Sequence, residues 1–321
     1  MADGFRPARR ENTAVTRALP LIVLILAGAA WGATQPLAKT AVSEGYRHFG
    51  ILFWQMGIGA AVLGLVCMLR GTPMRFTRRD MTLYTALALI GSVLPGISSY
   101  SAAIHLPSGV LSILLSSIPM IAFPIALAFG LEQFRWRRLA GLSLGFTGIC
   151  LLILPEASLP ASVPVIWVFV ALISSFFYAL ESSVVARWGL GGLDPVQTLC
   201  GASLVGMVIT LPLALMTGQF IDPRGPWGAP DLAIVASSLL HAAAYVAYVW
   251  LVGRAGAVFT VQISYFVTLF GVTWAMLFLN ESYSPYFWAA LAVMLGGLAL
   301  VQPRPKAVLV PTAPPGHTEP S

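Results

Sequence analysis

Long apolar runs, separated by short polar or Pro/Gly-rich gaps, dominate the chain from residue 18 to residue 301. A membrane-spanning helix needs about 20 predominantly apolar residues. Ten runs approach or reach that length, at residues 18–42, 48–69, 81–105, 107–131, 139–154, 163–186, 195–217, 231–253, 255–280 and 285–301. The runs are continuous and lack the alternation of a barrel strand. The pattern therefore predicts an all-α integral membrane protein with ten transmembrane helices.

Composition strengthens this prediction, because 58% of the residues are hydrophobic and 9% are charged, against about 25% charged in a soluble domain. A chain with this few charged residues cannot cover a water-exposed surface. The lipid bilayer is therefore the expected solvent. Outside the spans, residues 1–17 and 302–321 are predicted to be disordered cytoplasmic tails. The basic start and apolar first run are also typical of a signal peptide, but the run continues past Trp31 to residue 42, which favours a retained span.

The distribution of basic residues predicts the orientation. With a cytoplasmic N-terminus, fifteen of the eighteen Lys and Arg residues face the cytoplasm, and only Lys39, Arg47 and Arg224 lie on the other side. The positive-inside rule therefore predicts that both termini are cytoplasmic, in a bacterial-type inner (plasma) membrane. The net charge of +6 is concentrated in loops beside anionic lipid. We accordingly expect no nucleic-acid partner.

One segment recurs in the second half of the chain. A shift of 149 residues lays "ALAFGLEQFRW" over "AMLFLNESYSP", which matches Glu132 to Glu281, and Gly148 to Gly297. Five spans fall in each half, and because five is odd the second copy is inverted. Residues 18–154 and 163–301 are thus predicted to be two inverted-topology five-helix repeats, which typically enclose a substrate site near the bilayer midplane. Glu132 and Glu281, at helix ends, are expected to be loop anchors or caps.

Three stretches resemble the drug/metabolite transporter (DMT) superfamily, and specifically its EamA-type members. They are "WGATQPLAK" at residues 31–39, "SGVLSILLSSIPMIAFPIALAFGLEQFRWRRLAGLSLGFTGICLL" at 108–152 and "AGAVFTVQISYFVTLFGVTWAMLFLNESYSPYFWAALAVMLGGLAL" at 255–300. The resemblance implies a ten-helix secondary transporter, of a kind that often exports amino acids or other small metabolites. It also implies that no nucleotide is hydrolysed.

Polar side chains inside the spans are the candidates for a site, because they are expensive to place in lipid. Glu181 is the one acid well inside a predicted span. His241 lies near the middle of the eighth span, with Tyr245 and Tyr248 on the same helical face. His241 and Glu181 are the predicted carriers of proton coupling, since histidine titrates near neutral pH. The structural alternatives are interhelical hydrogen bonds or water for Glu181, a bond to a backbone carbonyl for His241, and packing for the tyrosines.

Three further residues complete the predicted substrate site. Trp31 and Gln262 lie at depths that match Glu181 and Tyr248, so these four are predicted to share one cavity. Gln55, in the second span, is predicted to hydrogen-bond the substrate. A tryptophan in an apolar helix is also a common core residue, which leaves packing open for Trp31. Lys39, near the outer end of its span, is expected to reach the lipid headgroups.

The pattern as a whole predicts an exporter of small metabolites, amino acids or related compounds, that works by alternating access with or without proton coupling. An uptake carrier or a drug efflux protein of the same fold is an alternative, and a passive pore or an intramembrane enzyme is an alternative of another class. The sequence lacks metal-ligand spacing, a Walker loop and a complete Gly-x-Ser-x-Gly elbow, so we expect no catalysis, metal or cofactor. Gly141, Gly145 and Gly148 form a small-residue stripe that serves either packing within the chain or a homodimer.

Overall fold

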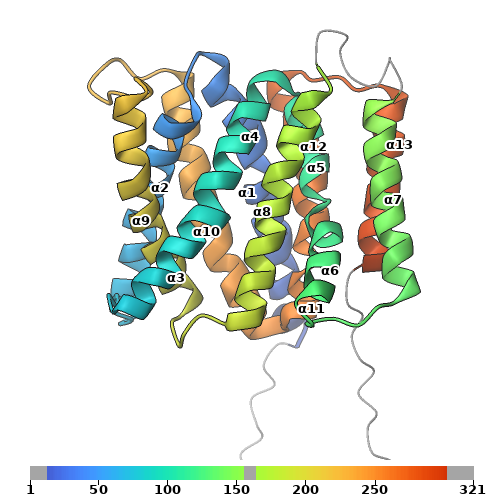
Figure 1. Cartoon of the computed structure of the whole chain (residues 1–321), viewed down its shortest axis with the longest axis horizontal. Helices are drawn as coiled ribbons and strands as arrows, with labels where there is room; N and C mark the ends of the chain where they lie inside the picture. The colour runs from blue at the N-terminus through green and yellow to red at the C-terminus, as the bar shows by residue number, and fades with distance from the viewer. Residues whose placement is uncertain (1–12, 155–163, 302–321) are drawn as a thin grey trace, which may run out of the picture.

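The computed structural model describes residues 13–154 and 164–301, and their regular elements are helices (Figure 1). The first half contains α1 (Thr13–Ser43), α2 (His48–Leu69), α3 (Arg78–Ala88), the π-helix η1 (Leu89–Val93), α4 (Leu94–His105), α5 (Ser108–Leu115), α6 (Ile118–Ala128) and α7 (Trp136–Ile153). The second half contains α8 (Ile166–Trp188), α9 (Pro195–Met216), α10 (Ala229–Ala255), α11 (Ala257–Thr260), α12 (Ile263–Leu279) and α13 (Pro285–Val301). The tails predicted at 1–17 and 302–321 lie mostly outside the described residues.

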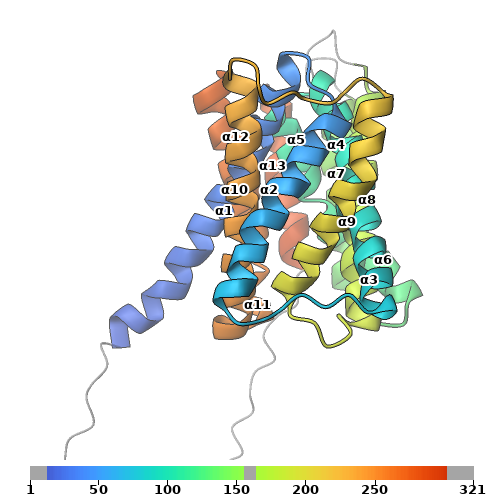
Figure 2. The ribbon, with the colours of Figure 1, turned by 90° about the vertical axis from the view of Figure 1, so that its left-hand side faces the viewer.

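Eight segments of the described chain are long and apolar enough to cross a membrane. Two shorter apolar helices, α12 and α13, stand beside them in the same bundle (Figure 1). Large apolar side chains such as Leu26, Phe146 and Val208 are exposed on its outside, which suits a surface that faces lipid. The all-helical membrane class is therefore confirmed, whereas the count of ten spans stays a prediction. Figure 2 shows the first turns of α1 leaning away from the bundle.

The helix contacts follow the symmetry of an inverted repeat. If the halves correspond in order, α1 matches α8, α2 matches α9, α3 with α4 matches α10, α5 with α6 matches α11 with α12, and α7 matches α13. The contact of α1 with α10 then has its counterpart in α8 with α4, and that of α1 with α12 in α8 with α6. The pairs α2 with α9 and α7 with α13 are their own counterparts. Packing thus agrees with the two-repeat architecture predicted from the 149-residue shift.

The third span is not the uninterrupted α-helix that its apolar run suggests. Pro95 has no backbone N–H and cannot bond the carbonyl of Gly91. The preceding residue, Leu94, donates instead to the Leu89 carbonyl, five residues back, which is the π-helical pattern. The span is therefore α3, η1 and α4 in succession, with Gly91 inside the π turn.

The fourth and ninth predicted spans, which are mates in the repeat, are also broken. Between α5 and α6 the hydroxyls of Ser116 and Ser117 donate to the carbonyls of Ile113 and Leu114, at 2.6 Å each. Such local bonds compete with the helical ladder, and Pro119 follows directly. The ninth span divides into α11 and α12. Discontinuous helices in corresponding positions of two repeats are a feature of many secondary transporters.

The glycine stripe of α7 is covered within the chain. A Cβ at Gly141 would lie 2.7 Å from the Gly297 carbonyl oxygen, and one at Gly148 would lie 2.3 Å from Met294 Cγ. A Cβ at Gly145 would lie 2.0 Å from Met120 Sδ. The stripe therefore packs α7 against α13 and α6, and offers no open face to a second copy. A homodimer stays a prediction, and the glycine stripe does not support it.

The close contact of α7 with α13 gives a prediction for stability. Gly297→Ala places a Cβ 2.7 Å from the Gly141 carbonyl oxygen, so the helices must separate. We expect a loss of about 1–3 kcal/mol, seen as a lower unfolding temperature of the purified protein in detergent. Gly296→Ala is the matched control, because a Cβ there meets nothing within 4 Å. Equal unfolding temperatures for the two variants would contradict this account of the packing.

Candidate functional site

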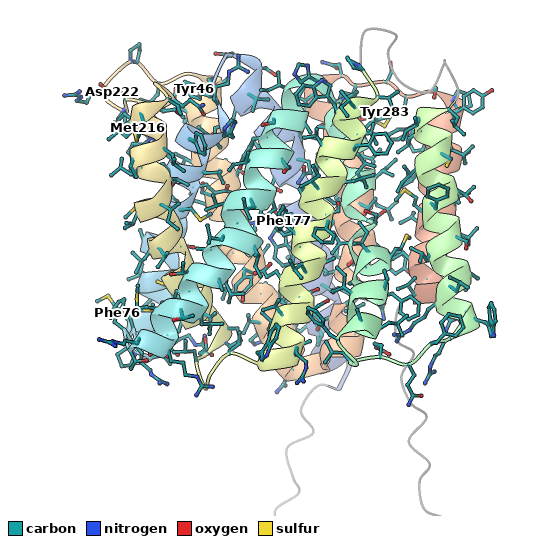
Figure 3. The ribbon with its side chains drawn as sticks, in the orientation of Figure 1. Tyr46, Phe76, Phe177, Met216, Asp222 and Tyr283 are labelled. Carbon is teal, nitrogen blue, oxygen red and sulfur yellow. The ribbon has the colours of Figure 1, made fainter. Side chains whose placement is uncertain are left out.

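The two ends of the bundle differ in charge. At one end, which we call the arginine-rich side, α2, α8 and α10 finish beside Arg70, Arg187 and Arg254, and α7 begins beside Arg135. The other end, which we call the opposite side, carries the loops that contain Tyr46, Asp222 and Tyr283 (Figure 3). Phe76 marks the arginine-rich side in the same view.

A cavity of about 440 Å³ lies between α3, α8, α9 and α10, within the usual range for small-molecule sites. Its wall is largely apolar and includes Leu87, Val185, Leu199, Ala202, Val249 and Val252. The polar lining side chains are Glu181, Thr198, Tyr245 and Tyr248. Leu190, Pro195 and Gly253, at or beyond helix ends, also line it, so the cavity extends to the arginine-rich side.

Glu181 enters the cavity from α8 where the third span is π-helical. A Cβ at Gly91 would lie 2.2 Å from Glu181 Oε1, so only glycine leaves room for the carboxylate. Pro95 produces the π turn and Gly91 provides the space, which together position the acid. Sequence reasoning found Glu181 and missed Gly91, although a proline four residues after a glycine was a signal of altered helical bonding at that glycine.

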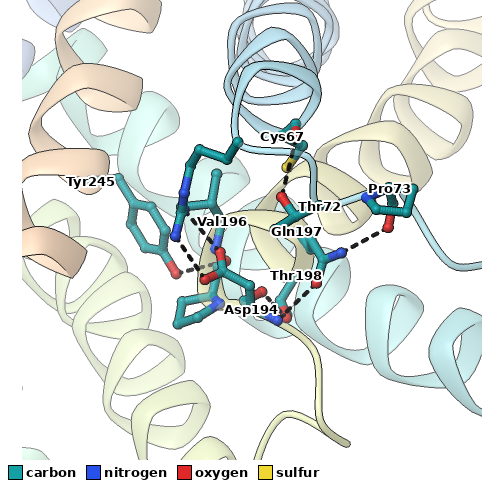
Figure 4. Close-up of polar contacts among 10 residues, drawn as sticks. Cys67, Thr72, Pro73, Asp194, Val196, Gln197, Thr198 and Tyr245 are labelled. Atoms are coloured by element: carbon teal, nitrogen blue, oxygen red, sulfur yellow. Dashed lines mark hydrogen bonds and ion pairs between the residues drawn. The ribbon is translucent and has the colours of Figure 1, made fainter. Parts of the chain in front are cut away.

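The mouth of the cavity is held by the start of α9. Asp194 accepts a hydrogen bond from the Val196 amide at 2.8 Å and pairs with both terminal nitrogens of Arg70 at 3.2 Å (Figure 4). Gln197 donates to the Pro73 carbonyl at 2.7 Å, and Tyr245 donates to the Pro195 carbonyl at 3.3 Å. These contacts join the start of α9 to the end of α2 and to the middle of α10, and they hold the first turn of α9 against the cavity.

Trp31 and His241 meet across the two repeats. The Trp31 indole Nε1 donates to His241 Nδ1 at 3.2 Å, and the Trp31 ring lies 5.7 Å, centroid to centroid, from the ring of Tyr248. Tryptophan only donates, so His241 Nδ1 accepts and is unprotonated in this arrangement. Tyr248 therefore connects the cavity to the contact between α1 and α10.

The remaining predicted residues lie elsewhere. Gln55 accepts a hydrogen bond from the Tyr100 hydroxyl at 2.8 Å, and lines a narrow crevice with Ser237 and Ser238. Gln262 is exposed between α11 and α12 and does not line the 440 Å³ cavity. The structure thus brings Trp31, His241, Tyr245, Tyr248 and Glu181 together, and leaves Gln55 and Gln262 apart. A role in substrate binding stays a prediction for Gln55 and Gln262. It also stays a prediction for the five residues that the structure brings together.

On the opposite side, the two repeats are joined by several polar contacts. Tyr46 donates to Asp231 at 2.7 Å, Trp54 donates to the Ile221 carbonyl at 3.0 Å, and the Phe49 amide donates to Gln219 at 3.1 Å. Burial and the bond to Asp231 raise the pKa of Tyr46 to about 12, so this phenol stays a donor at physiological pH.

Glu281 also joins the two repeats on the opposite side. Its two carboxylate oxygens accept hydrogen bonds from the amides of Ser108 and Gly109, at 2.8 and 3.2 Å. These amides begin α5 and lack intrahelical partners. Tyr283 also donates to Glu281, and desolvation together with that bond raises the pKa of the Tyr283 phenol. The expectation that Glu281 caps a helix is confirmed. Its mate Glu132 pairs with Arg138 at 2.7 Å.

Lys39 has partners within the protein that the sequence did not predict. Its ammonium donates to the carbonyls of Ala103 and Ile104, at 2.8 and 3.2 Å, and its contact with the headgroups stays a prediction. Carbonyls in the last turn of a helix lack intrahelical donors and attract cations. Lys39 thus fastens α1 to the end of α4.

Together, the bundle, the paired helix contacts and a cavity open toward one end are typical of a multi-pass membrane protein of the transporter class. The chain belongs to the EamA-like transporter family, whose model matches residues 18–154 and 165–302. Membership confirms the resemblance seen in the sequence, and the family indicates a transporter rather than an enzyme. Among the described residues, no group of three or more His, Cys, Asp or Glu could hold a metal ion.

Two curated relatives are also described as transporters. The chain is 21% identical to a "probable terminal-alkyne amino-acid exporter" of Streptantibioticus cattleyicolor, over 88% of this chain and 92% of that protein. It is 24% identical to the "uncharacterized transporter YvbV" of Bacillus subtilis, over 86% of this chain and 89% of that protein. A solved crystal structure is similar in fold, with a TM-score of 0.62 and 17% identity over 88% of this chain and 96% of that chain.

Proposed function

We propose that this protein exports small metabolites, amino acids or related compounds, across a bacterial-type inner membrane by alternating access. The observation that carries the proposal is the 440 Å³ cavity, which extends to the arginine-rich side while polar contacts join the repeats on the opposite side. By the positive-inside rule, the arginine-rich side is cytoplasmic. In this form the cavity therefore faces the cytoplasm, from which an exporter collects its cargo. The exporter name of one relative is consistent with this direction.

Glu281 and Glu132 supply a mechanism for the change of access. Glu281 holds the start of α5 and closes the opposite side. Alternating access in such folds arises when one repeat rocks against the other, and we propose that the two halves here exchange conformations as they do so. Glu281 would then release α5, and Glu132 would leave Arg138 and take the corresponding place at residues 257–258, which are the mates of 108–109.

The direct test compares extracellular metabolites from cells that lack the protein with those from cells that overproduce it. A compound enriched outside only with the protein would identify the cargo and support export. A compound depleted from the medium would instead indicate an uptake carrier. Flux that rises linearly with concentration in liposomes, without saturation, would indicate a passive pore and contradict alternating access.

Proton coupling through His241 can be tested in the same system. Protonation of His241 Nδ1 requires the Trp31 bond to break, which would loosen α1 from α10. We expect His241→Gln to flatten the pH dependence of transport between about pH 5 and 8. Trp31→Phe is the control, because it removes the donor and keeps the imidazole, so pH dependence should remain. An unchanged pH profile in His241→Gln would remove histidine from the coupling and leave Glu181 as the predicted proton carrier.

A further inference from the structure

The residues that line the cavity carry negative charge and no positive charge. Glu181 is the one carboxylate among its lining residues, and none of the residues that line it is Lys, Arg or His. Within residues 13–154 and 164–301, no hydrogen bond or ion pair joins the Glu181 carboxylate to another residue. An unpaired anion at membrane depth is costly, so a ligand that brings a positive charge to it gains binding energy.

The rest of the wall suits a cation with an apolar body. Tyr245 and Tyr248 line the cavity together with Glu181, and aromatic rings attract desolvated cations by about 0.5–2 kcal/mol. Val185, Val249 and Leu199 supply apolar surface. A free carboxylate on the ligand would instead meet a like charge and no base within the cavity, which disfavours an unmodified amino acid.

We propose that the ligand of this cavity is a protonated organic amine with an apolar body, in which a carboxylate is absent or neutralised. The ammonium binds Glu181, the tyrosine rings flank it, and the body contacts the valine and leucine side chains. This inference rests on the proposed function only in so far as the cavity is the cargo site. It narrows the proposed cargo from amino acids or related compounds to the related compounds that carry an amine without a free carboxylate.

The test uses three probes that share a phenyl ring: phenethylamine, phenylalanine and 3-phenylpropionate. Each is titrated against the purified full-length protein in detergent at pH 7, with the unfolding temperature as the readout. We expect phenethylamine to bind at least about tenfold more tightly than phenylalanine. Tenfold in affinity is the ratio that corresponds to the free energy of one charge-assisted hydrogen bond. We expect 3-phenylpropionate to give no shift.

Two variants and a control locate the effect. Glu181→Gln keeps the shape of the side chain and should abolish the preference for the amine. Gly91→Ala keeps the acid, but its Cβ would lie 2.2 Å from Oε1, so the carboxylate must move and the preference should weaken. Glu44→Gln, an exposed acid outside the cavity, should behave as the unmodified protein does.

Three results would overturn the inference: phenylalanine binding as tightly as phenethylamine, an amine preference that survives Glu181→Gln, or no binding of any probe. Transport in proteoliposomes separates this failure from failure of the proposed function. Metabolite transport without amine preference would leave a transporter whose ligand is not an amine. Amine binding at Glu181 without movement of any compound would keep the ligand class and contradict the transporter role.

Discussion

Transport by the Glu181→Gln variant is expected to fall at least about tenfold. The substitution removes the one carboxylate that lines the cavity and preserves its size, so binding loses a charge-assisted contact of about 1.5–3 kcal/mol. The measurement is the initial rate of cargo movement in proteoliposomes with equal amounts of folded protein. If Glu181 also carries the coupled proton, the variant additionally loses accumulation against a gradient, while exchange of cargo across the membrane declines less.

The matched control for this experiment is Glu44→Gln, which removes an exposed acid on the opposite side and should transport normally. Glu181→Asp provides a second comparison, because it keeps the charge and shortens the reach, and should retain part of the rate. Normal transport by Glu181→Gln would mean that the carboxylate has only a structural role against Gly91.

Opening of the opposite side is expected to increase several-fold in Glu281→Gln. A glutamine keeps one acceptor oxygen but loses the charge and the second acceptor, so the amides of Ser108 and Gly109 are held less strongly. A lost charged hydrogen bond of about 1.5–3 kcal/mol is enough to change a two-state population by about tenfold. The readout is the rate at which a membrane-impermeant maleimide labels a Ser112→Cys reporter, in a chain without its native cysteines. Ser112 is fully buried on α5.

Glu132→Gln is the matched control for this labelling, since Glu132 is the repeat mate of Glu281 and pairs with Arg138 on the arginine-rich side. We expect it to leave the reporter as protected as before, or more protected. Equal labelling in Glu281→Gln and in the unmodified protein would show that the other polar contacts alone close the opposite side.

The spans were predictable from the sequence because each depends on local composition. An apolar run of spanning length must satisfy its own backbone in lipid, and a helix does so without help from distant residues. The three interruptions were less visible. Pro95 and Pro119 lie in runs that are continuous apolar segments in the sequence. The π turn at Gly91 depends on which carbonyl the backbone N–H groups beside Pro95 bond to, and the sequence does not show this.

The site was partly predictable for the same reason. Glu181 and His241 stood out because polar side chains are rare in apolar helices, and Tyr245 with Tyr248 followed from helical spacing. The pairing of Trp31 with His241, 210 residues apart, depends on how α1 and α10 pack. Gln262 matched the other candidates in depth but does not line the cavity, because depth alone carries no information on helix rotation. Gln55 lines a separate crevice.

Sequence alone determined the membrane class, the two-repeat family and the charge asymmetry, because hydropathy, a 149-residue shift and arginine placement are all properties of the linear chain. Only the tertiary structure decided that Gly91 receives Glu181, that Glu281 caps α5 while Glu132 pairs with Arg138, and that the glycine stripe of α7 is covered by α13. These contacts join residues far apart along the chain. They follow from the rotation and tilt of packed helices, which depend on the fit of whole surfaces and not on any local pattern.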